Sequence, residues 1–327
     1  MIYLLIVLIV IAVIWYFSWY GLAERVNPDD FQDPPPEDSL LKGAEPFFFE
    51  GQSDSAFLLI HGYESSPYSL RQIGDILQTM DHTVLCPLLP GHGTSLVELS
   101  KTRYEHWYEA VRRIYVRERP KYKNFFIIGF SLGGNLAIRL AIQYKDTVAP
   151  SALILISSPV QLNGFINHSI FMRDWRLMFT GIGKYILPPV SKKRDVVSAD
   201  IMNPTVSYNE AYSLPPLHSF RTNIGKVKKY LKDIKVPACL IHASNDWTVN
   251  AENMHYIFRK LGSKEKRAYM FTIEDKVSTR HELMTHEQIR DKVIHYIFSF
   301  LNEFFLDFEY QSEMLPKNHK SNKGWFS

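Results

Sequence analysis

Short, nearly continuous apolar runs alternate with longer amphipathic stretches from residue 46 onward. The runs, rich in β-branched and aromatic residues, cover 47–49, 56–60, 83–86, 125–128, 152–156, 238–242 and 269–273. The stretches between them, such as 70–80 and 104–118, repeat apolar residues at helical spacing, as does the final stretch, 289–308. Strands that are apolar throughout are buried on both faces, so the pattern predicts an α/β fold with a mainly parallel sheet covered by helices.

One section interrupts this alternation. Residues 159–228 contain no convincing strand and are rich in Met, Trp, Phe and Pro. Because they stand between two strand–helix units, we expect a helical cap inserted over the edge of the sheet where the strands end, which is where parallel sheets bind ligands.

The N-terminal segment has a different character. Residues 1–23 carry no charged side chain, and residues 2–17 are almost all aliphatic or aromatic. About 20 such residues span a bilayer, so we expect a single-pass transmembrane anchor and a membrane location for the protein. Arg25 is the only basic residue near either end, which leaves the orientation open. The alternatives are a cleaved signal peptide, whose basic start is missing here, and a buried core helix.

Composition adds limits to this picture. Residues 24–45 are acidic and proline-rich and are expected to form an extended spacer, residues 46–310 the globular domain, and residues 311–327 a basic tail. The formal net charge of +3 is too small and too dispersed to indicate a nucleic-acid partner. Cys86 and Cys239 both lie in apolar runs, so we expect buried thiols and no disulfide framework.

The strongest chemical signal is Gly129-Phe130-Ser131-Leu132-Gly133-Gly134, which stands between a predicted strand and a predicted helix. A G-x-S-x-G motif in this context is a nucleophile elbow. The glycines are needed because the turn is too tight for neighbouring Cβ atoms, and the turn forces the serine into a strained conformation that presents its hydroxyl. We therefore predict Ser131 as a nucleophile.

A serine hydroxyl needs a base to remove its proton, and the base needs a carboxylate to orient it. In elbow-containing sheets these groups follow the serine in the order Asp or Glu, then His, each beyond the end of a strand. Asp246 follows the run 238–242, and His281 lies on the loop after 269–273. We predict Asp246 as the acid and His281 as the base.

Other residues compete for these roles. Asp233 precedes its strand, and Asp275 is too close to the histidine in sequence. Both are therefore weaker candidates for the carboxylate of the triad. His286 is the nearest alternative base, but it stands where the last helix is expected to begin.

His61-Gly62-Tyr63 ends the run 56–60, where a first oxyanion donor is expected. The backbone N–H groups of Tyr63 and Leu132 are the predicted donors, each worth about 3 kcal/mol of transition-state stabilisation. We expect the ring of His61 to be structural and His92 to brace a loop at the edge of the site. His106, His242 and His295 lack metal-ligand spacing with carboxylates, so neither a metal nor a cofactor is predicted.

These motifs, with Pro90-Gly91-His92-Gly93 and Trp107, resemble bacterial carboxylesterases and monoacylglycerol lipases of the serine-aminopeptidase-like group of α/β-hydrolases. The resemblance covers residues 47–305 and implies a core sheet of about eight strands with a small cap. It implies the same nucleophile, acid, base and oxyanion donors. Arg280 departs from the pattern, because these enzymes often have glycine before the histidine, and the cap here is long and poorly matched.

The expected function is therefore hydrolysis of carboxylic esters through an acyl-enzyme, without a cofactor. An anchor near lipid would favour a lipid-derived or monoacylglycerol-type ester. The apolar cap residues also favour an acyl-chain pocket, although ordinary helix packing explains them as well: Phe171, Trp175, Met178 and Phe179. The alternatives are acyl transfer or peptide cleavage on the same triad, and a catalytically inactive, membrane-tethered binding protein.

Overall fold

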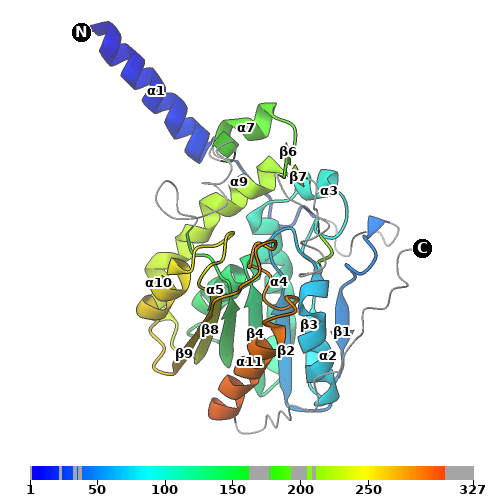
Figure 1. Ribbon diagram of the computed structural model, residues 1–327. Helices are drawn as coiled ribbons and strands as arrows, with labels where there is room; N and C mark the ends of the chain where they lie inside the picture. Colours follow the sequence, from blue (N-terminus) through cyan, green and yellow to red (C-terminus); the bar gives the residue numbers. More distant parts are fainter. Residues whose placement is uncertain are drawn as a thin grey trace.

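The computed structural model (Figure 1) describes residues 2–21, 24–31, 35, 39–161, 177, 179–192, 205–207 and 211–305. The predicted basic tail lies outside the described residues. So do Phe171, Trp175 and Met178 of the expected cap.

A seven-stranded sheet with the order β1-β3-β2-β4-β5-β8-β9 forms the centre of the molecule. Its strands are β1 (Phe47–Phe49), β2 (Ser55–Ile60), β3 (Thr83–Cys86), β4 (Asn124–Phe130), β5 (Ala152–Ile156), β8 (Ala238–Ala243) and β9 (Lys266–Phe271). Only β1 runs antiparallel to its neighbour. Each predicted strand is present, and the described sheet has one strand fewer than the eight or so that the family resemblance implied.

Both faces of the central strands β2, β3, β4, β5 and β8 are buried, as the continuous apolar runs predicted, whereas the edge strands β1 and β9 are only partly buried. Along β2, Phe57 and Leu59 pack into one core layer, whereas Leu58 and Ile60 pack into the other. The first layer also receives side chains from α2 (Arg71–Thr79) and α11 (Arg290–Phe304). The second receives them from α4 (Tyr104–Glu118), α5 (Leu132–Gln143) and α10 (Glu252–Lys260). Each fully buried large apolar side chain contributes about 1.5–3 kcal/mol relative to exposure.

The remaining core helices are short. They are η2 (Pro67–Leu70), α3 (Leu96–Lys101), η3 (Arg119–Lys121) and η5 (Ile224–Asp233). Because β2, β4, β5, β8 and β9 are mutually parallel, the loops that follow them emerge at one edge of the sheet. The segments of Tyr63, Ser131, Asp246 and His281 therefore meet at that edge.

Above this edge lies the described part of the cap, which includes α7 (Thr180–Ile186) and α9 (Leu214–Asn223) (Figure 1). The expectation that the cap contains no strand is wrong. β6 (Val190–Ser191) and β7 (Ala211–Tyr212) form a small antiparallel sheet. Two-residue strands leave no apolar run for a sequence pattern to detect.

The N-terminal segment forms the expected helix, α1 (Ile2–Tyr20). None of the helices within the described residues is long and apolar enough to cross a membrane, so the predicted transmembrane anchor is not supported. The last turn of α1 packs against α7: Ser18 is 2% exposed, and a Cβ on Gly181 would lie 2.3 Å from the Phe17 carbonyl oxygen.

The described part of the expected spacer lies against the domain. Glu24 forms ion pairs with Arg103 at 2.9 Å and Lys184 at 3.4 Å, which connects it to α4 and α7. His106 Nε2 is 3.0 Å from the Asn27 carbonyl oxygen. These contacts place the segment along α4.

Candidate active site

The turn between β4 and α5 has the strained geometry that the elbow motif predicts. Ser131 has φ 51° and ψ −116°, a conformation that costs a non-glycine residue about 1–3 kcal/mol. The turn admits no side chain at Gly133 or Gly134. A Cβ at the first would lie 1.9 Å from the Ile60 carbonyl oxygen, and one at the second 1.7 Å from Ser158 Oγ. The glycines thus allow the serine to stand at the start of α5, at the edge of the sheet.

The structure brings the three predicted side chains into one hydrogen-bonded chain. His281 Nε2 lies 2.9 Å from Ser131 Oγ, and His281 Nδ1 lies 2.6 Å from Asp246 Oδ2. The histidine comes from the loop after β9 and the aspartate from the loop after β8. This arrangement can transfer the serine proton to the imidazole while the carboxylate stabilises the resulting imidazolium.

The carboxylate of Asp246 is fully enclosed and held from several sides. Its Oδ1 accepts hydrogen bonds from the backbone N–H groups of Thr248 at 2.7 Å and Val249 at 3.0 Å. His242 Nε2 lies 3.2 Å from Asp246 Oδ2 and 3.0 Å from the Val249 carbonyl oxygen. This contact of His242 with Asp246 was not predicted from the sequence. The signal available in the sequence was the position of His242, four residues before Asp246 and near the end of the strand that leads to it.

Electrostatics favour the ionised carboxylate. Burial raises the pKa of Asp246, but the charge of His281 and hydrogen bonds from His242 and His281 outweigh it, so the pKa lies below its ordinary value. Burial likewise lowers the pKa of His281, yet the charge and hydrogen bond of Asp246 outweigh burial and the pKa lies above its ordinary value. The pair therefore suits a base that gains a proton during the reaction.

The competing residues lie elsewhere. His286 Nε2 is 3.0 Å from Asp275 Oδ2, so these two form a separate pair. Asp233 forms an ion pair with Lys145 at 3.2 Å. Both residues stand near the opposite edge of the sheet, because Lys145 follows α5 and Asp233 precedes β8.

The predicted oxyanion donors flank the serine. A Cβ on Gly62 would lie 3.2 Å from Ser131 Cβ, so the turn that carries Tyr63 passes in contact with the elbow. Leu132 is the first residue of α5, where a backbone N–H has no acceptor within its own helix and the helix dipole favours negative charge. Tyr63 and Leu132 thus approach Ser131 from two different elements.

His61 and His92 occupy structural positions, as expected. His61 Nε2 accepts a hydrogen bond from the Leu89 N–H at 3.0 Å, and its Nδ1 lies 2.9 Å from the Gly62 carbonyl oxygen. The ring of His92 packs edge-on to Trp107 at 5.2 Å between centroids. Burial holds the pKa of both imidazoles below the ordinary value, to about 4 for His92, so both are neutral at pH 7.

The turn that carries Tyr63, the predicted oxyanion turn, is also tied to the cap, by contacts that the sequence did not predict. The Tyr63 hydroxyl donates a hydrogen bond to the Ser213 carbonyl oxygen at 3.2 Å, and the ring stacks on Phe220 of α9 at 5.5 Å. Glu64, the next residue, has φ 55° and pairs with Lys192 beyond β6 at 2.7 Å. Burial raises the pKa of Glu64, and the charge of Lys192 offsets only part of this rise.

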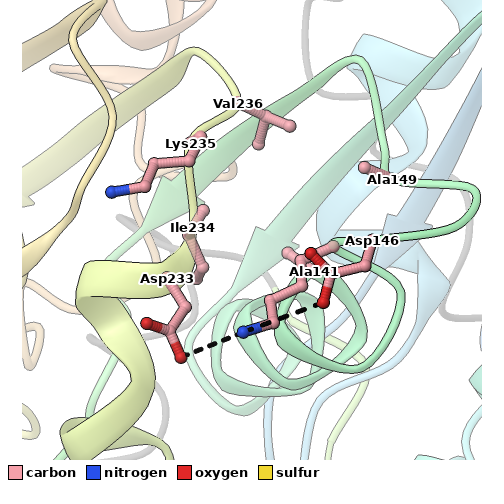
Figure 2. A pocket seen from close by; sticks show the side chains of 8 residues that line it. Ala141, Asp146, Ala149, Asp233, Ile234, Lys235 and Val236 are labelled. Atoms are coloured by element: carbon pink, nitrogen blue, oxygen red, sulfur yellow. Dashed lines mark hydrogen bonds and ion pairs between the residues drawn. The ribbon is translucent and has the colours of Figure 1, made fainter.

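Two further observations delimit the site. A cavity of about 240 Å³ lies at the opposite edge of the sheet from Ser131. Figure 2 shows residues that line it, among them Ala141, Asp146, Ala149 and the segment 233–236. Within the described part of the chain, no group of three or more His, Cys, Asp or Glu side chains is placed to hold a metal ion.

Comparison with known proteins agrees with this architecture. The model of the family described as serine aminopeptidase, S33, matches residues 51–288. A thermostable monoacylglycerol lipase of Bacillus sp. (strain H-257) is 28% identical over 69% of this chain and 84% of its own length. A carboxylesterase of Bacillus subtilis (strain 168) is 23% identical over 79% of this chain and 96% of its own.

Solved structures share the fold. A structure from the metagenome-derived lipolytic enzymes LipS and LipT superposes with a TM-score of 0.66 at 21% identity, covering 81% of this chain and 99% of its own. A soluble variant of monoglyceride lipase from Saccharomyces cerevisiae gives a TM-score of 0.65 at 14% identity over 87% of this chain and 98% of its own. The chain therefore belongs to the serine aminopeptidase S33 family of α/β-hydrolases and is a carboxylic ester hydrolase.

Proposed function

We propose that this protein hydrolyses lipid-derived esters of the monoacylglycerol type, with Ser131 as nucleophile, His281 as base and Asp246 as the acid that orients the base. The observation that carries the proposal is the continuous hydrogen-bonded chain from Ser131 Oγ through His281 to Asp246 at a strained elbow. The monoacylglycerol class is supported by the name of the Bacillus sp. relative, and the broader ester class by that of the Bacillus subtilis relative.

The proposed reaction proceeds in two steps. His281 Nε2 takes the proton of Ser131, whose oxygen attacks the ester carbonyl, and the N–H groups of Tyr63 and Leu132 stabilise the oxyanion. His281 then gives its proton to the leaving alcohol, which leaves an acyl group on Ser131. A water molecule, deprotonated by His281, attacks this acyl group, and the acid departs as Ser131 regains its proton.

Described apolar residues of the cap support an acyl-chain substrate. Leu214, Leu217 and Phe220 of α9 are buried against the core layer that contains Leu132. Phe220 also stacks on Tyr63 at 5.5 Å between ring centroids, so this apolar cluster reaches the turn that carries Tyr63. An acyl chain that approached along this cluster would meet apolar side chains.

Labelling with a fluorophosphonate probe tests the nucleophile. We expect the full-length protein to be labelled once and Ser131→Ala to be unlabelled. The matched control Ser299→Ala, on the exposed face of α11, should label like the wild type. An unlabelled wild type would refute the proposed serine mechanism.

A substrate panel tests the ester class. We expect monoacylglycerols and p-nitrophenyl esters to be cleaved, with a kcat/KM that depends on acyl length, and aminoacyl amides to be cleaved far more slowly. The family is named after an aminopeptidase, so preferential cleavage of the amides would replace the lipase proposal with a peptidase.

A further inference from the structure

The residue before the base is in an unusual conformation. Arg280 has φ 57°, in the left-handed region that favours glycine. This geometry explains why glycine is frequent at this position in enzymes that the chain resembles. A non-glycine residue persists there only if its surroundings hold it.

Backbone and side-chain contacts hold Arg280 on the side of its own loop. Its N–H donates to Ser278 Oγ at 3.1 Å, and its Nε donates to the Asp275 carbonyl oxygen at 2.7 Å. The Asp275 carboxylate in turn accepts hydrogen bonds from the Val277 and Ser278 N–H groups, each at 2.7 Å, and from Ser278 Oγ at 2.6 Å. The loop that leads to His281 is therefore closed around Asp275.

A second set of contacts crosses to the loop of the acid. The guanidinium carbon of Arg280 lies 4.5 Å from the ring centroid of Trp247, the residue after Asp246. The Trp247 N–H donates a hydrogen bond to the Thr279 carbonyl oxygen at 2.9 Å. The two loops that supply Asp246 and His281 are thus joined immediately beside both residues.

We propose that Arg280 and Trp247 are positioning residues that clamp the His281 loop onto the Asp246 loop and so hold the imidazole in its bridge to Ser131. The proposal rests on the function proposed above. Arg280 replaces the unstrained turn that glycine would allow with a strained turn whose side chain reaches the neighbouring loop. Trp247 is 38% exposed, so its ring is available for substitution without opening the core.

Substitutions at Trp247 test the cross-loop contact in the full-length protein. Trp247→Leu removes the ring but alters no charge, and we expect kcat to fall by about 10-fold to 100-fold with KM within about two-fold, because small misplacements are costly in this range. Trp247→Phe retains a ring face and should recover most of the loss. The matched control Phe304→Leu removes the ring beneath Arg267, 5.1 Å from its guanidinium carbon, and should not change kcat.

The pH profile separates positioning from general stability. Asp246 and Glu282 are the charged groups that raise the pKa of His281. A looser Asp246–His281 hydrogen bond should therefore move the acid limb of kcat/KM to lower pH in Trp247→Leu. A purely structural loss of active protein would lower the whole profile without shifting it.

Substitutions at Arg280 separate strain from contact. Arg280→Ala keeps the Cβ strain and loses the side chain, whereas Arg280→Gly loses both. We expect both to lower kcat about equally, while Arg280→Gly has the higher Tm because glycine accepts φ 57° freely. An Arg280→Gly enzyme with a higher Tm than Arg280→Ala but a lower kcat than the wild type would support the clamp.

Two results have distinct meanings. Wild-type kcat and an unshifted pH profile in both Trp247→Leu and Arg280→Gly would overturn the clamp while the proposed function stands. A wild-type protein that neither cleaves esters nor reacts with fluorophosphonate would overturn the proposed function itself, and the clamp with it.

Discussion

The two sides of Ser131 are held in place by different parts of the molecule. On the acid–base side, Asp246 and His281 are held by the loops after β8 and β9 and by their hydrogen bond to each other. The hydroxyl of Ser157, directly after β5, also donates a hydrogen bond to the His281 carbonyl oxygen at 3.2 Å. On the oxyanion side, the turn of Tyr63 is fastened to the cap through Ser213, Phe220 and Lys192. The acid–base geometry thus depends on the hydrolase core, whereas the oxyanion geometry also depends on the cap.

The largest expected effect tests the acid–base side. Asp246→Asn should lower kcat by about 10⁴-fold. Its Oδ1 would still accept the Thr248 and Val249 N–H groups, so its NH₂ would face His281 Nδ1 and favour the tautomer that cannot accept the serine proton. Steady-state hydrolysis of a p-nitrophenyl ester measures this.

The control for Asp246→Asn is Asp233→Asn, at the opposite edge of the sheet, which should keep wild-type kcat. A loss of less than about ten-fold in Asp246→Asn would mean that the carboxylate does not orient the base.

A smaller effect is expected on the oxyanion side. Glu64 and Lys192 are buried, with side chains 7% and 9% exposed, so breaking their pair in Lys192→Met should lower the free energy of unfolding by about 3–5 kcal/mol. We also expect kcat to fall by about 10-fold, less than the 10²–10³-fold cost of removing a donor, because Tyr63 is displaced but not lost. Urea unfolding and steady-state kinetics measure the two effects.

A double variant sharpens this test. Glu64→Gln with Lys192→Met leaves no lone buried charge and should be more stable than either single variant. Lys101→Met breaks an exposed pair with Glu98 and should cost less than about 1 kcal/mol. If Lys192→Met kept wild-type stability and kcat, the oxyanion turn would not depend on the cap, and the contrast between the two sides would fail.

The smallest effect is a shift in pH dependence. In the proposed mechanism the neutral form of His281 is the base, and the pKa of this imidazole lies above the ordinary value of 6.5. Because the protonated form persists to higher pH, the acid limb of kcat/KM should have its midpoint above 6.5 in the wild type. In Asp246→Asn the influence that raises the pKa is lost while burial remains, so the residual activity should show a midpoint at lower pH.

His295→Gln, an exposed residue of α11, is the control for the pH profile and should leave the midpoint unchanged. A wild-type midpoint below 6.5 would show that burial, not Asp246, dominates the titration of His281.

Local patterns were sufficient for much of this fold. The runs that form β2, β3, β4, β5 and β8 are almost entirely apolar, and strands buried on both faces leave this signature regardless of their partners. The elbow could also be predicted, because its glycines and its flanking strand and helix are adjacent in sequence. The chain order of serine, aspartate and histidine then left only a few candidates for the acid and the base.

Other features were settled by distance in space. The sequence left His286 as an alternative to His281, and only the placement of Asp275 shows that His286 is occupied elsewhere. Three other features left no periodic signal in the sequence: the pair of Glu64 with Lys192, the strands β6 and β7, and the packing of α1 on α7. The apolar N-terminus correctly predicted a helix, but its composition did not predict that the last turn of this helix contacts α7.

By itself, then, the sequence determined the strands, the elbow with Ser131 and the loops that carry Asp246, His281 and Tyr63, because burial and turn chemistry act between near neighbours in the chain. Tertiary structure alone decided which imidazole reaches Ser131, how Arg280 meets Trp247 and how the cap holds Glu64. These are contacts between side chains from separate segments, and their energies depend on distances and angles that exist only once the sheet has brought the segments together.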